Sequence, residues 1–475
     1  MTTHYSSDNT TGYKGTAGKV TASIFKAYDV RGIVGETLTD DVVYDIGRAI
    51  GSEAAARGQA KVCVARDGRL SGPGFVAALT QGLLDTGRDV IDLGRVPTPV
   101  LYFATYHLNT GSGVMVTGSH NPPNYNGFKI MLGGDTLSGD TIQRLRRCIE
   151  NNDFETGQGH AQQIDICADY LDRITGDVKL KRPLNVIVDC GNGVAGELAP
   201  ELLRRLGCTV TELFCEIDGN FPNHHPDPSK PKNLEDLIAA LDDSDADIGL
   251  AFDGDGDRLG VVDSEKNIIW PDRQLMLYAA DVLKRNPGGE IIFDVKCTSN
   301  LIKVITDNGG KATMSMTGHS LIKARMKETA ALLAGEMSGH VFFKERWYGF
   351  DDGLYTMARL LEILSADERR SHEVFAALPD AVSTPELNVH FARDGEHFEF
   401  MDKFVKVARF DGAEIITMDG IRANFANGWG LVRASNTTPS LVIRFEADDE
   451  AALAHIKQLF RQAIHEADDT LVLPF

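Results

Sequence analysis

The sequence of 475 residues contains 48 Lys and Arg against 68 Asp and Glu, and its formal net charge of −20 argues against general nucleic-acid or anionic-membrane binding. Its 7 Cys include no CxxC pair, which indicates reduced thiols and a cytoplasmic protein rather than a disulfide framework or a zinc site. Residues 1–21 are polar and lack the apolar core of a signal peptide, and no later apolar run reaches the roughly 18 residues of a membrane span. We therefore expect a loose N-terminal tail, globular domains, and neither nucleic-acid nor membrane partners.

Apolar strands that end in polar turns before helix-like segments recur along the chain. They cover residues 62–72, 185–196 and 291–300, and each is followed by a second strand and polar loop, at 114–122, 248–258 and 331–343. Alternating β and α segments predict α/β domains with mixed, mostly parallel sheets. Because ligand loops gather at the carboxyl ends of such strands, we expect three similar α/β domains around one central cleft.

The C-terminal part of the chain follows another pattern. Strand-like stretches such as GWGLVRASNTTP and SLVIRFEA precede one amphipathic helix, AALAHIKQLFRQAIHEA. This order predicts a smaller α+β fourth domain. The expected boundaries are 22–164, 165–267, 268–379 and 380–475, after a tail at 1–21.

Ser119 stands in a loop that regular structure cannot absorb. Val114, Met115 and Val116 form an apolar run typical of a buried strand, and the Gly, Asn and Pro residues around Ser119 stop either strand or helix. A hydroxyl is therefore held at a strand end. Taken alone, this loop is more typical of an ordinary turn serine that bonds to its own backbone.

The glycines of CGNGVAG spell GxGxxG after a strand and before a helix, with Glu212 about twenty residues further on. This is the context of a dinucleotide site. The equivalent turns at 66–72 and 296–299 lack the glycines, however, and a dinucleotide would leave the other polar loops without a role. We do not favour this interpretation.

In the next loop, DGDGDR, Asp253, Asp255 and Asp257 alternate with glycines. Alternation can point the carboxylates the same way, and the glycines let the backbone curl around an ion. An EF-hand is excluded because its sixth and twelfth positions would be Arg258 and Ser264. Carboxylates at a strand end favour Mg²⁺, although a solvated acidic turn is the alternative.

Two further loops offer groups suited to a phosphorylated sugar. GEMSGH places Glu336, Ser338 and His340 at alternate positions, so one face of an extended strand would present an acceptor, a hydroxyl and an imidazole. RASNTTP combines an arginine with hydroxyls and free backbone amides, which is a phosphate cradle. Each loop alone is also typical of an ordinary polar turn. The cradle residues are Arg433, Ser435, Asn436, Thr437 and Thr438.

Together, TGSHNP, DGDGDR, GEMSGH and RASNTTP, in this order and at domain-length separations, resemble the α-D-phosphohexomutases, in particular the bacterial phosphomannomutase/phosphoglucomutase group. The resemblance runs from about Phe25 to near the C-terminus and includes AYDVRG, GFKI, DVKCTS and TGHS. It implies an isomerase that interconverts hexose 1-phosphate and hexose 6-phosphate, of mannose, glucose or both. The implied route uses a phosphoserine and a hexose 1,6-bisphosphate intermediate.

Carried over by position, the resemblance implies a role for each motif residue. Ser119 would bear the phosphoryl group beside Mg²⁺ on Asp253, Asp255 and Asp257, with Lys129 and His319 as candidates for proton transfer and Arg258 as a further catalytic group. Substrate contacts would come from Tyr28, Arg31, Lys296, Glu336, Ser338, His340, Arg433, Ser435, Asn436, Thr437 and Thr438.

Two other functions would use the same loops. A phosphatase would keep the serine and the metal but release inorganic phosphate, and a sugar-phosphate sensor would keep the sugar and phosphate loops without needing Ser119. The partners expected in every case are small sugar phosphates. A monomer is expected rather than an oligomer.

Overall fold

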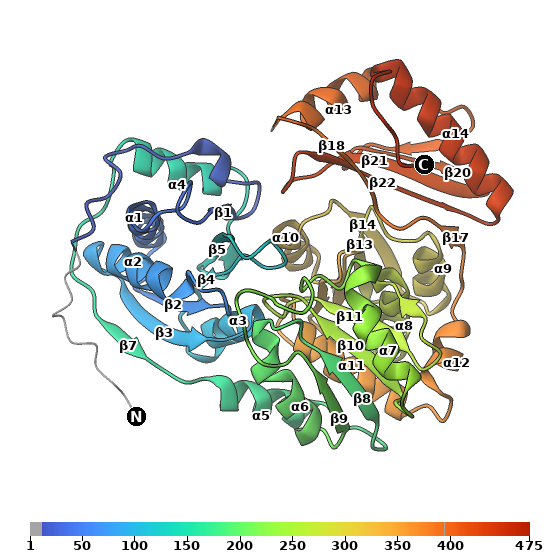
Figure 1. The fold of residues 1–475 in the computed structure, drawn as a ribbon, viewed down its shortest axis with the longest axis horizontal. Helices are drawn as coiled ribbons and strands as arrows, with labels where there is room; N and C mark the ends of the chain where they lie inside the picture. The colour runs from blue at the N-terminus through green and yellow to red at the C-terminus, as the bar shows by residue number, and fades with distance from the viewer. Residues whose placement is uncertain (1–11, 394) are drawn as a thin grey trace.

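The computed structural model describes residues 12–393 and 395–475, and these form three α/β domains and a smaller C-terminal domain (Figure 1). Of the expected loose tail, residues 1–11 lie outside the described residues. The remainder is attached and not loose: Tyr13 stacks on Tyr44 with ring centroids 5.5 Å apart, and the backbone N–H of Thr16 donates to Asp45. Both partners lie on helix α1 (Asp40–Ala56).

The elements of the first domain are, in chain order, η1 (Ala22–Ile24), β1 (Val30–Ile33), α1, β2 (Lys61–Arg66), α2 (Gly72–Asp85), β3 (Asp89–Arg95), α3 (Thr98–His107), β4 (Gly113–Val116), β5 (Tyr125–Leu132), β6 (Asp135–Thr136), α4 (Asp140–Glu150) and β7 (Ala161–Gln163). The sheet order is β1-β5-β4-β2-β3-β7, with β6 beside β5. β2 pairs parallel with β3 and β4, whereas β4 and β5 are antiparallel. All residues of β4 are buried because the sheet is covered on both faces.

The second domain contains α5 (Cys167–Asp177), β8 (Asn185–Asp189), η2 (Val194–Glu197), α6 (Ala199–Arg205), β9 (Thr209–Leu213), η3 (Pro231–Leu234), α7 (Glu235–Asp242), β10 (Ile248–Phe252), β11 (Leu259–Asp263) and β12 (Ile268–Ile269). The third contains α8 (Pro271–Arg285), β13 (Glu290–Asp294), α9 (Asn300–Asp307), β14 (Lys311–Ser315), α10 (His319–Thr329), β15 (Leu333–Gly335), β16 (Val341–Phe343), α11 (Gly353–Ser365) and α12 (Ser371–Ala376). Their sheet orders are β12-β11-β10-β8-β9 and β14-β13-β15-β16.

The fourth domain contains β17 (Val382–Ser383), β18 (Leu387–His390), α13 (Glu396–Val407), β19 (Glu414–Ile416), β20 (Ile421–Phe425), β21 (Gly428–Ala434), β22 (Ser440–Ala447) and α14 (Glu450–Ala467). Its strands are antiparallel, and α13 and α14 lie side by side over the sheet (Figure 1). The aromatic rings of Phe404, Phe445 and Phe460 fill the space between helices and sheet. The mixed sheets of the first three domains and the α+β fourth domain are confirmed.

Each of the four loops expected to carry the site joins an antiparallel strand pair. The Ser119 loop joins β4 to β5, the aspartate loop β10 to β11, the GEMSGH loop β15 to β16, and the RASNTTP loop β21 to β22. Such pairs can be joined by short loops, whereas parallel strands need a long crossover. Each loop is therefore short and held at both ends by buried strands.

Candidate active site

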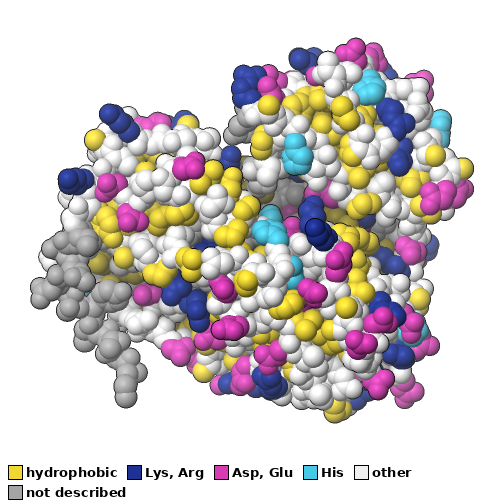
Figure 2. Space-filling model, in the orientation of Figure 1, with side chains coloured by type: hydrophobic (Ala, Val, Ile, Leu, Met, Phe, Trp, Pro, Cys, Tyr) yellow, Lys and Arg dark blue, Asp and Glu magenta, His cyan; other side chains and the backbone are white. Residues whose placement is uncertain are grey.

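A cavity of about 580 Å³ lies where the four domains meet. The space-filling view shows a hollow between the C-terminal domain and the rest of the molecule, with Lys, Arg and His side chains at its rim (Figure 2). Of the residues singled out in the sequence, those that line it are Tyr28, Arg31, Ser119, Lys129, Arg258, Lys296, His319, Glu336, Ser338, His340, Arg433, Ser435, Asn436, Thr437 and Thr438. The three aspartates are fully buried beneath its floor.

Ser119 is held in a strained conformation at this floor. Its φ is +50°, a left-handed value that is unusual for a residue other than Gly. The buried Arg69 imposes the shape of the loop by donating to the carbonyl oxygens of Ser119 and Asn121, at 2.9 and 2.6 Å, and to two more at Pro122 and Tyr125. Gly118 must be Gly, since a Cβ there would lie 2.3 Å from Nε of Arg69.

The hydroxyl of Ser119 faces the aspartate loop. Its Oγ donates to Oδ2 of Asp253 at 3.2 Å. The two loops touch along their backbones as well, because a Cβ on Gly254 would lie 2.4 Å from the carbonyl oxygen of Ser119. The serine and the carboxylates, 134 residues apart, form one site.

Lys129 neutralises two of the three carboxylates. Its Nζ donates to Oδ2 of Asp255 at 2.7 Å and to Oδ2 of Asp257. Burial opposes the charge of Lys129, but these two carboxylates outweigh it and raise its pKa well above the ordinary value. Burial likewise opposes ionisation of Asp257, yet Lys129 and His340 hold the pKa of that carboxyl well below its usual range.

Asp253 is in the opposite electrostatic situation. Burial and the nearby charges of Asp255 and Asp257 raise its pKa well above the ordinary value. Its Oδ1 accepts backbone hydrogen bonds from Gly256 at 3.0 Å and Arg258 at 3.2 Å. The side chain of Arg258 lies 3.8 Å from Oδ2 of Asp253, but this cation does not outweigh burial and the two neighbouring carboxylates.

The aspartate loop has the donor set of a hard divalent cation. One carboxylate oxygen from each of Asp253, Asp255 and Asp257 lies within 4.8 Å of the others. Oδ1 of Asp255 is buried and has no hydrogen-bond partner among the described residues. A buried carboxylate oxygen without a donor is costly, and clustered oxygen ligands are those Mg²⁺ accepts. These residues fit such an ion.

The GEMSGH loop is a tight turn and not the extended strand that its alternating pattern predicted, because the backbone N–H of Glu336 donates to the carbonyl oxygen of His340 at 2.9 Å. The turn nevertheless brings its three polar side chains together. Nδ1 of His340 lies 3.0 Å from Oε2 of Glu336 and 3.1 Å from Oγ of Ser338. Burial disfavours the charge of His340, but Asp257 outweighs it and raises the pKa to about 9. A backbone bridge between Arg258 and His340 joins this loop to the aspartate loop.

The two candidates for proton transfer differ in charge. Burial, together with the positive charges of Lys323 and Lys129, lowers the pKa of His319 well below its ordinary value. His319 is therefore neutral at pH 7 while Lys129 is protonated. Tyr28 packs edge-on against the His319 ring with centroids 5.1 Å apart, and burial raises the pKa of its phenol to about 12.

The RASNTTP loop presents an arginine with one free end. Nε of Arg433 donates to Asp419 at 2.9 Å, whereas its Nη2 is buried without a partner among the described residues. Oγ of Ser435 accepts from the backbone N–H groups of Thr437 and Thr438, at 3.3 and 3.2 Å. The Ser435 hydroxyl thus shapes the turn, and Nη2 of Arg433 offers a donor to the cavity.

Arg31 and Lys296 are anchored by acids at opposite sides of the cavity. Arg31 donates to Asp29 at 2.6 Å and to Asn121 of the Ser119 loop at 2.5 Å. Nζ of Lys296 donates to Glu386 at 3.0 Å. Burial opposes ionisation of Glu386, but Lys296 lowers its pKa to about 2, so the pair is ionised at neutral pH.

Sequence reasoning missed several groups at this site. Nδ1 of His120 lies 3.2 Å from Oγ of Ser119, and Lys230 and Glu386 line the cavity. Arg69 lies in a turn that the repeated strand pattern did identify, but nothing in its local sequence shows that it holds the Ser119 loop. His120 could have been singled out from TGSHNP by its adjacency to the serine.

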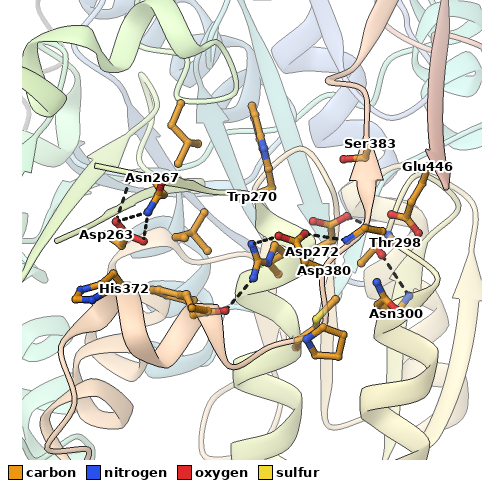
Figure 3. Close-up of a pocket in the computed structure, with 18 of the residues that line it drawn as sticks. Asp263, Asn267, Trp270, Asp272, Thr298, Asn300, His372, Asp380, Ser383 and Glu446 are labelled. Carbon is orange, nitrogen blue, oxygen red and sulfur yellow. Dashed lines mark hydrogen bonds and ion pairs between the residues drawn. The ribbon is translucent and has the colours of Figure 1, made fainter. Parts of the chain in front are cut away.

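A larger cavity, of about 790 Å³, lies at the junction of the second, third and fourth domains (Figure 3). It contains none of the residues singled out as site residues. Its carboxylates are already engaged: Asp263 accepts from Asn267 at 3.0 Å, and Asp272 accepts from the backbone N–H of Thr298 at 3.0 Å. The smaller cavity, with its free donor and its strained serine, is the better candidate for chemistry.

The GxGxxG turn has a structural use. Gly191 has a φ of +49°, and a Cβ on Gly193 would lie 3.1 Å from the carbonyl oxygen of Asp253. The backbone N–H of Val194 donates to the carbonyl oxygen of Gly254 at 3.2 Å. These glycines let the turn pack directly beneath the aspartate loop, which explains the motif without a dinucleotide.

Comparisons with known proteins agree with this architecture. Models of the α/β/α domains I, II and III of phosphoglucomutase/phosphomannomutase match residues 22–156, 168–266 and 270–382, and the model of its C-terminal domain matches 386–463. Across the described residues, no helix is long and apolar enough to cross a membrane.

Relatives match over almost the whole chain. A phosphomannomutase/phosphoglucomutase of Pseudomonas aeruginosa is 59% identical over 454 residues, covering 96% of this chain and 98% of that protein. A phosphoglucomutase of Neisseria gonorrhoeae is 58% identical over 458 residues, covering 96% and 99%. The crystal structure of a phosphoglucomutase/phosphomannomutase family protein from Burkholderia thailandensis is 56% identical, with a TM-score of 0.91 over 96% of this chain and 100% of that one. The chain therefore belongs to the phosphoglucomutase/phosphomannomutase family.

Proposed function

We propose that this phosphohexomutase interconverts hexose 1-phosphate and hexose 6-phosphate through a phosphoryl group on Ser119 and a hexose 1,6-bisphosphate intermediate. The isomerase activity itself follows from family membership. The observation that carries the proposal is the position of Ser119. Its backbone is strained, and its hydroxyl lies 3.2 Å from Asp253. Ser119 lines a cavity whose other walls carry the sugar and phosphate loops.

Asp253, Asp255 and Asp257 would hold Mg²⁺ together with the phosphoryl group of Ser119. When bound, the ion supplies positive charge to phosphoryl oxygens, which is the main requirement of phosphoryl transfer. A phosphoserine carries about −2 and three aspartates −3, so one Mg²⁺ leaves the site strongly anionic. Lys129 and Arg258 supply the remaining positive charge beside the loop.

The protonation states favour a division of labour between the proton-transfer candidates. Neutral His319 is able to accept the proton of the attacking sugar hydroxyl, and protonated Lys129 is able to return one. His120, next to the Ser119 oxygen, is a further proton carrier at the serine itself.

Substrate binding is assigned to the loops of the third and fourth domains. Glu336, Ser338 and His340 would bond to sugar hydroxyls common to glucose and mannose, so we propose that both sugars are accepted. Nη2 of Arg433 would bind the phosphate that is not being transferred, with the RASNTTP turn around it. Tyr28, Arg31 and Lys296 complete the walls. Because one chain supplies all these groups, we propose that a monomer is active.

Peptide mass spectrometry of the purified protein tests the proposal. We expect a phosphate on Ser119, and we expect Ser119→Ala to lose activity. In a coupled assay, mannose 1-phosphate or glucose 1-phosphate with a trace of hexose 1,6-bisphosphate should give 6-phosphate without free phosphate. Release of inorganic phosphate would indicate a phosphatase, and binding without turnover would indicate a sensor. Full activity of Ser119→Ala would refute the mechanism.

A further inference from the structure

β8 and β9 are neighbouring parallel strands (Figure 1), and a cysteine follows the carboxyl end of each. Cys190 follows β8 and is fully buried, whereas Cys215 lies just beyond β9 and is partly exposed. Their sulfur atoms are 3.6 Å apart. Among the seven cysteines, all of which the structure describes, no other sulfur–sulfur contact is present.

The backbone geometry permits a bond between these sulfurs. Asp189 pairs with Leu213, so Cys190 and Cys215 follow the ends of the two strands with an offset of one residue. Adjacent strands lie about 4.8 Å apart, and disulfides span Cα separations of about 4.4–6.8 Å, which leaves room for such an offset. The backbone N–H of Cys190 donates to the carbonyl oxygen of Leu213 at 3.1 Å, so the two strand ends remain paired up to the cysteines. A disulfide needs the sulfurs about 2.05 Å apart, which requires an approach of roughly 1.5 Å.

The Cys190 turn supports the catalytic loops through a chain of backbone contacts. The carbonyl oxygen of Cys190 accepts from the N–H of Gly193 at 2.7 Å, and the next residue, Val194, donates to Gly254 at 3.2 Å. Gly254 in turn packs on the backbone of Ser119. A shift at Cys190 therefore reaches the aspartate loop and the serine through direct contacts.

The segment that carries Cys215 is bonded to the same turn. The backbone N–H of Asn192 donates to the carbonyl oxygen of Phe214 at 2.8 Å, and the Asn192 side chain donates to that of Glu216 at 2.8 Å. Phe214 has a φ of +49°, so the backbone there has little freedom to adjust. Drawing the sulfurs together must thus move the 190–194 turn, the 214–216 segment, or both.

We propose that Cys190 and Cys215 form a reversible disulfide in response to hydrogen peroxide, and that this disulfide lowers mutase activity by displacing the turn beneath the aspartate loop. Cys215, the partly exposed residue of the pair, attacks one peroxide oxygen as a thiolate, the O–O bond breaks, and a sulfenic acid and hydroxide form. The Cys190 sulfur then attacks the sulfenic sulfur, and its proton leaves with the hydroxyl group as water. Overall, two thiols lose two protons and two electrons, and peroxide is reduced to two waters.

Peptide mapping under non-reducing conditions tests the bond directly, with no dependence on activity. After treatment with hydrogen peroxide, we expect a peptide pair joined through Cys190 and Cys215 that is lighter by two hydrogen masses. Activity should fall roughly ten- to hundredfold in the same sample, as expected for a displacement on the order of 1 Å near a reacting group. Dithiothreitol should restore both the free thiols and the activity.

Variants separate this pair from other oxidation. Cys215→Ser and Cys190→Ala should each lose the link and keep their activity in peroxide, and either variant suffices if the other folds poorly. Cys148→Ser is the matched control: its thiol on α4 is also partly exposed, donates to the carbonyl oxygen of Asp153, and should leave the response unchanged. The proposal is overturned if no linked peptide forms, if the linked enzyme stays fully active, or if Cys215→Ser loses activity as wild type does.

Discussion

At the scale of single residues, the aspartate loop contains a carboxyl that lowers the stability of the fold but serves its function. Asp253 is the carboxyl whose ionised form burial and its neighbours oppose, while its Oδ1 bonds only to backbone N–H groups. An Asn oxygen can accept those same bonds. Ionised Asp253 therefore carries a cost to the fold that the ion pair with Arg258 does not offset, and a carboxyl at this position points to a use in binding a cation.

We predict that Asp253→Asn keeps or raises the melting temperature but lowers turnover at least roughly a hundredfold, equivalent to about 2.7 kcal/mol in the activation barrier. Removing the charge relieves repulsion from Asp255 and Asp257 but weakens cation binding. Calorimetry and a Mg²⁺ titration of activity measure the two effects. Asp263→Asn, which changes a buried carboxyl outside the site, should keep normal turnover. A normal Mg²⁺ response in Asp253→Asn would contradict the assignment.

Arg69 is a second residue that cannot be replaced without the loss of hydrogen bonds that the site needs. Its two terminal nitrogens donate to four carbonyl oxygens of the Ser119 loop, and a lysine has one nitrogen in their place. We predict that Arg69→Lys lowers the free energy of unfolding by about 2–4 kcal/mol, through loss of at least two bonds to buried acceptors. Turnover should fall as well, because the Ser119 loop is no longer held in its conformation.

Arg66→Lys is the control for that change, since Arg66 lies in the same region and bonds to the carbonyl oxygen of Asp67. In Arg66→Lys, we expect the free energy of unfolding, measured by chemical denaturation, and the extent of Ser119 phosphorylation to be almost unchanged. If Arg69→Lys is as stable and active as Arg66→Lys, the loop does not depend on the guanidinium fork.

At the scale of elements, a buried carboxyl caps helix α11. Asp352 accepts from the backbone N–H of Tyr355 at 2.9 Å, the Tyr170 hydroxyl at 2.8 Å and the Trp347 indole at 3.1 Å. Burial is the largest influence and raises the pKa of Asp352 to about 7, although these donors act against it. The cap also joins α11 to α5 of the second domain.

This pKa predicts a decline in stability with rising pH. Between about pH 4, the unfolded value, and about pH 7, the folded protein holds a proton that the unfolded chain has released. The contribution is therefore fully present below about pH 4 and lost as pH rises to about 7, on the order of a few kcal/mol. Asp352→Asn keeps the cap without titrating, so its melting temperature should vary less over this window.

Melting temperatures at about pH 5 and about pH 8 measure this effect. Asp449→Asn is the matched control, because Asp449 caps α14 at an exposed position and accepts from the N–H of Ala452. It should retain the pH dependence of the wild type. Equal pH dependence in Asp352→Asn and wild type would show that this carboxyl does not carry the effect.

The order of strands and the polar loops could be predicted because both depend on local signals. Apolar runs mark buried strands, and Gly, Pro, Asn and Ser end them, so the loops of Ser119 and Asp253 were found where the structure has them. The sequence does not show that the strand after each loop runs antiparallel, since an apolar strand has the same residue pattern in either direction. The exact domain boundaries stay predictions.

Other groups could not be predicted because they depend on contacts between distant segments. Arg69 reaches a loop about fifty residues away, and Glu386 pairs with Lys296 across a domain junction. The proximity of Cys190 and Cys215 arises only from the pairing of β8 with β9. The charge of Lys129 was expected at the site, but its position between two aspartates arises only where β5 meets the β10–β11 loop of the second domain.

At the scale of the whole molecule, the fourth domain is attached differently from the other three. One continuous apolar core runs through the first three domains, whereas the fourth has its own. A small cluster of Val295, Trp429 and Leu431 joins it to the third domain. Polar contacts also join the two domains, such as the ion pair of Arg444 with Asp272 at 2.8 Å. We expect this domain to move when the cavity opens for the bisphosphate to turn.

Arg433 links phosphate binding to the position of that domain. Asp419 accepts from Nε of Arg433 at 2.9 Å and from the backbone N–H of Thr317 in the third domain at 3.0 Å. The guanidinium thus keeps its acidic partner while Nη2 stays available for a phosphate. A lysine has a single nitrogen and must give up one of these two partners.

We predict that Arg433→Lys raises KM roughly ten- to hundredfold for both the 1-phosphate and the 6-phosphate, through loss of one charge-assisted hydrogen bond of about 1.5–3 kcal/mol. KM should rise by a similar factor for both isomers, because in the bisphosphate scheme the phosphates at the two ends of the sugar bind alternately in one cradle. Steady-state kinetics in the two directions measure this, and Arg409→Lys, a change elsewhere in the fourth domain, should leave both KM values unchanged. If only one isomer is affected, the two phosphates bind at separate places, and a single cradle that holds each end in turn is ruled out.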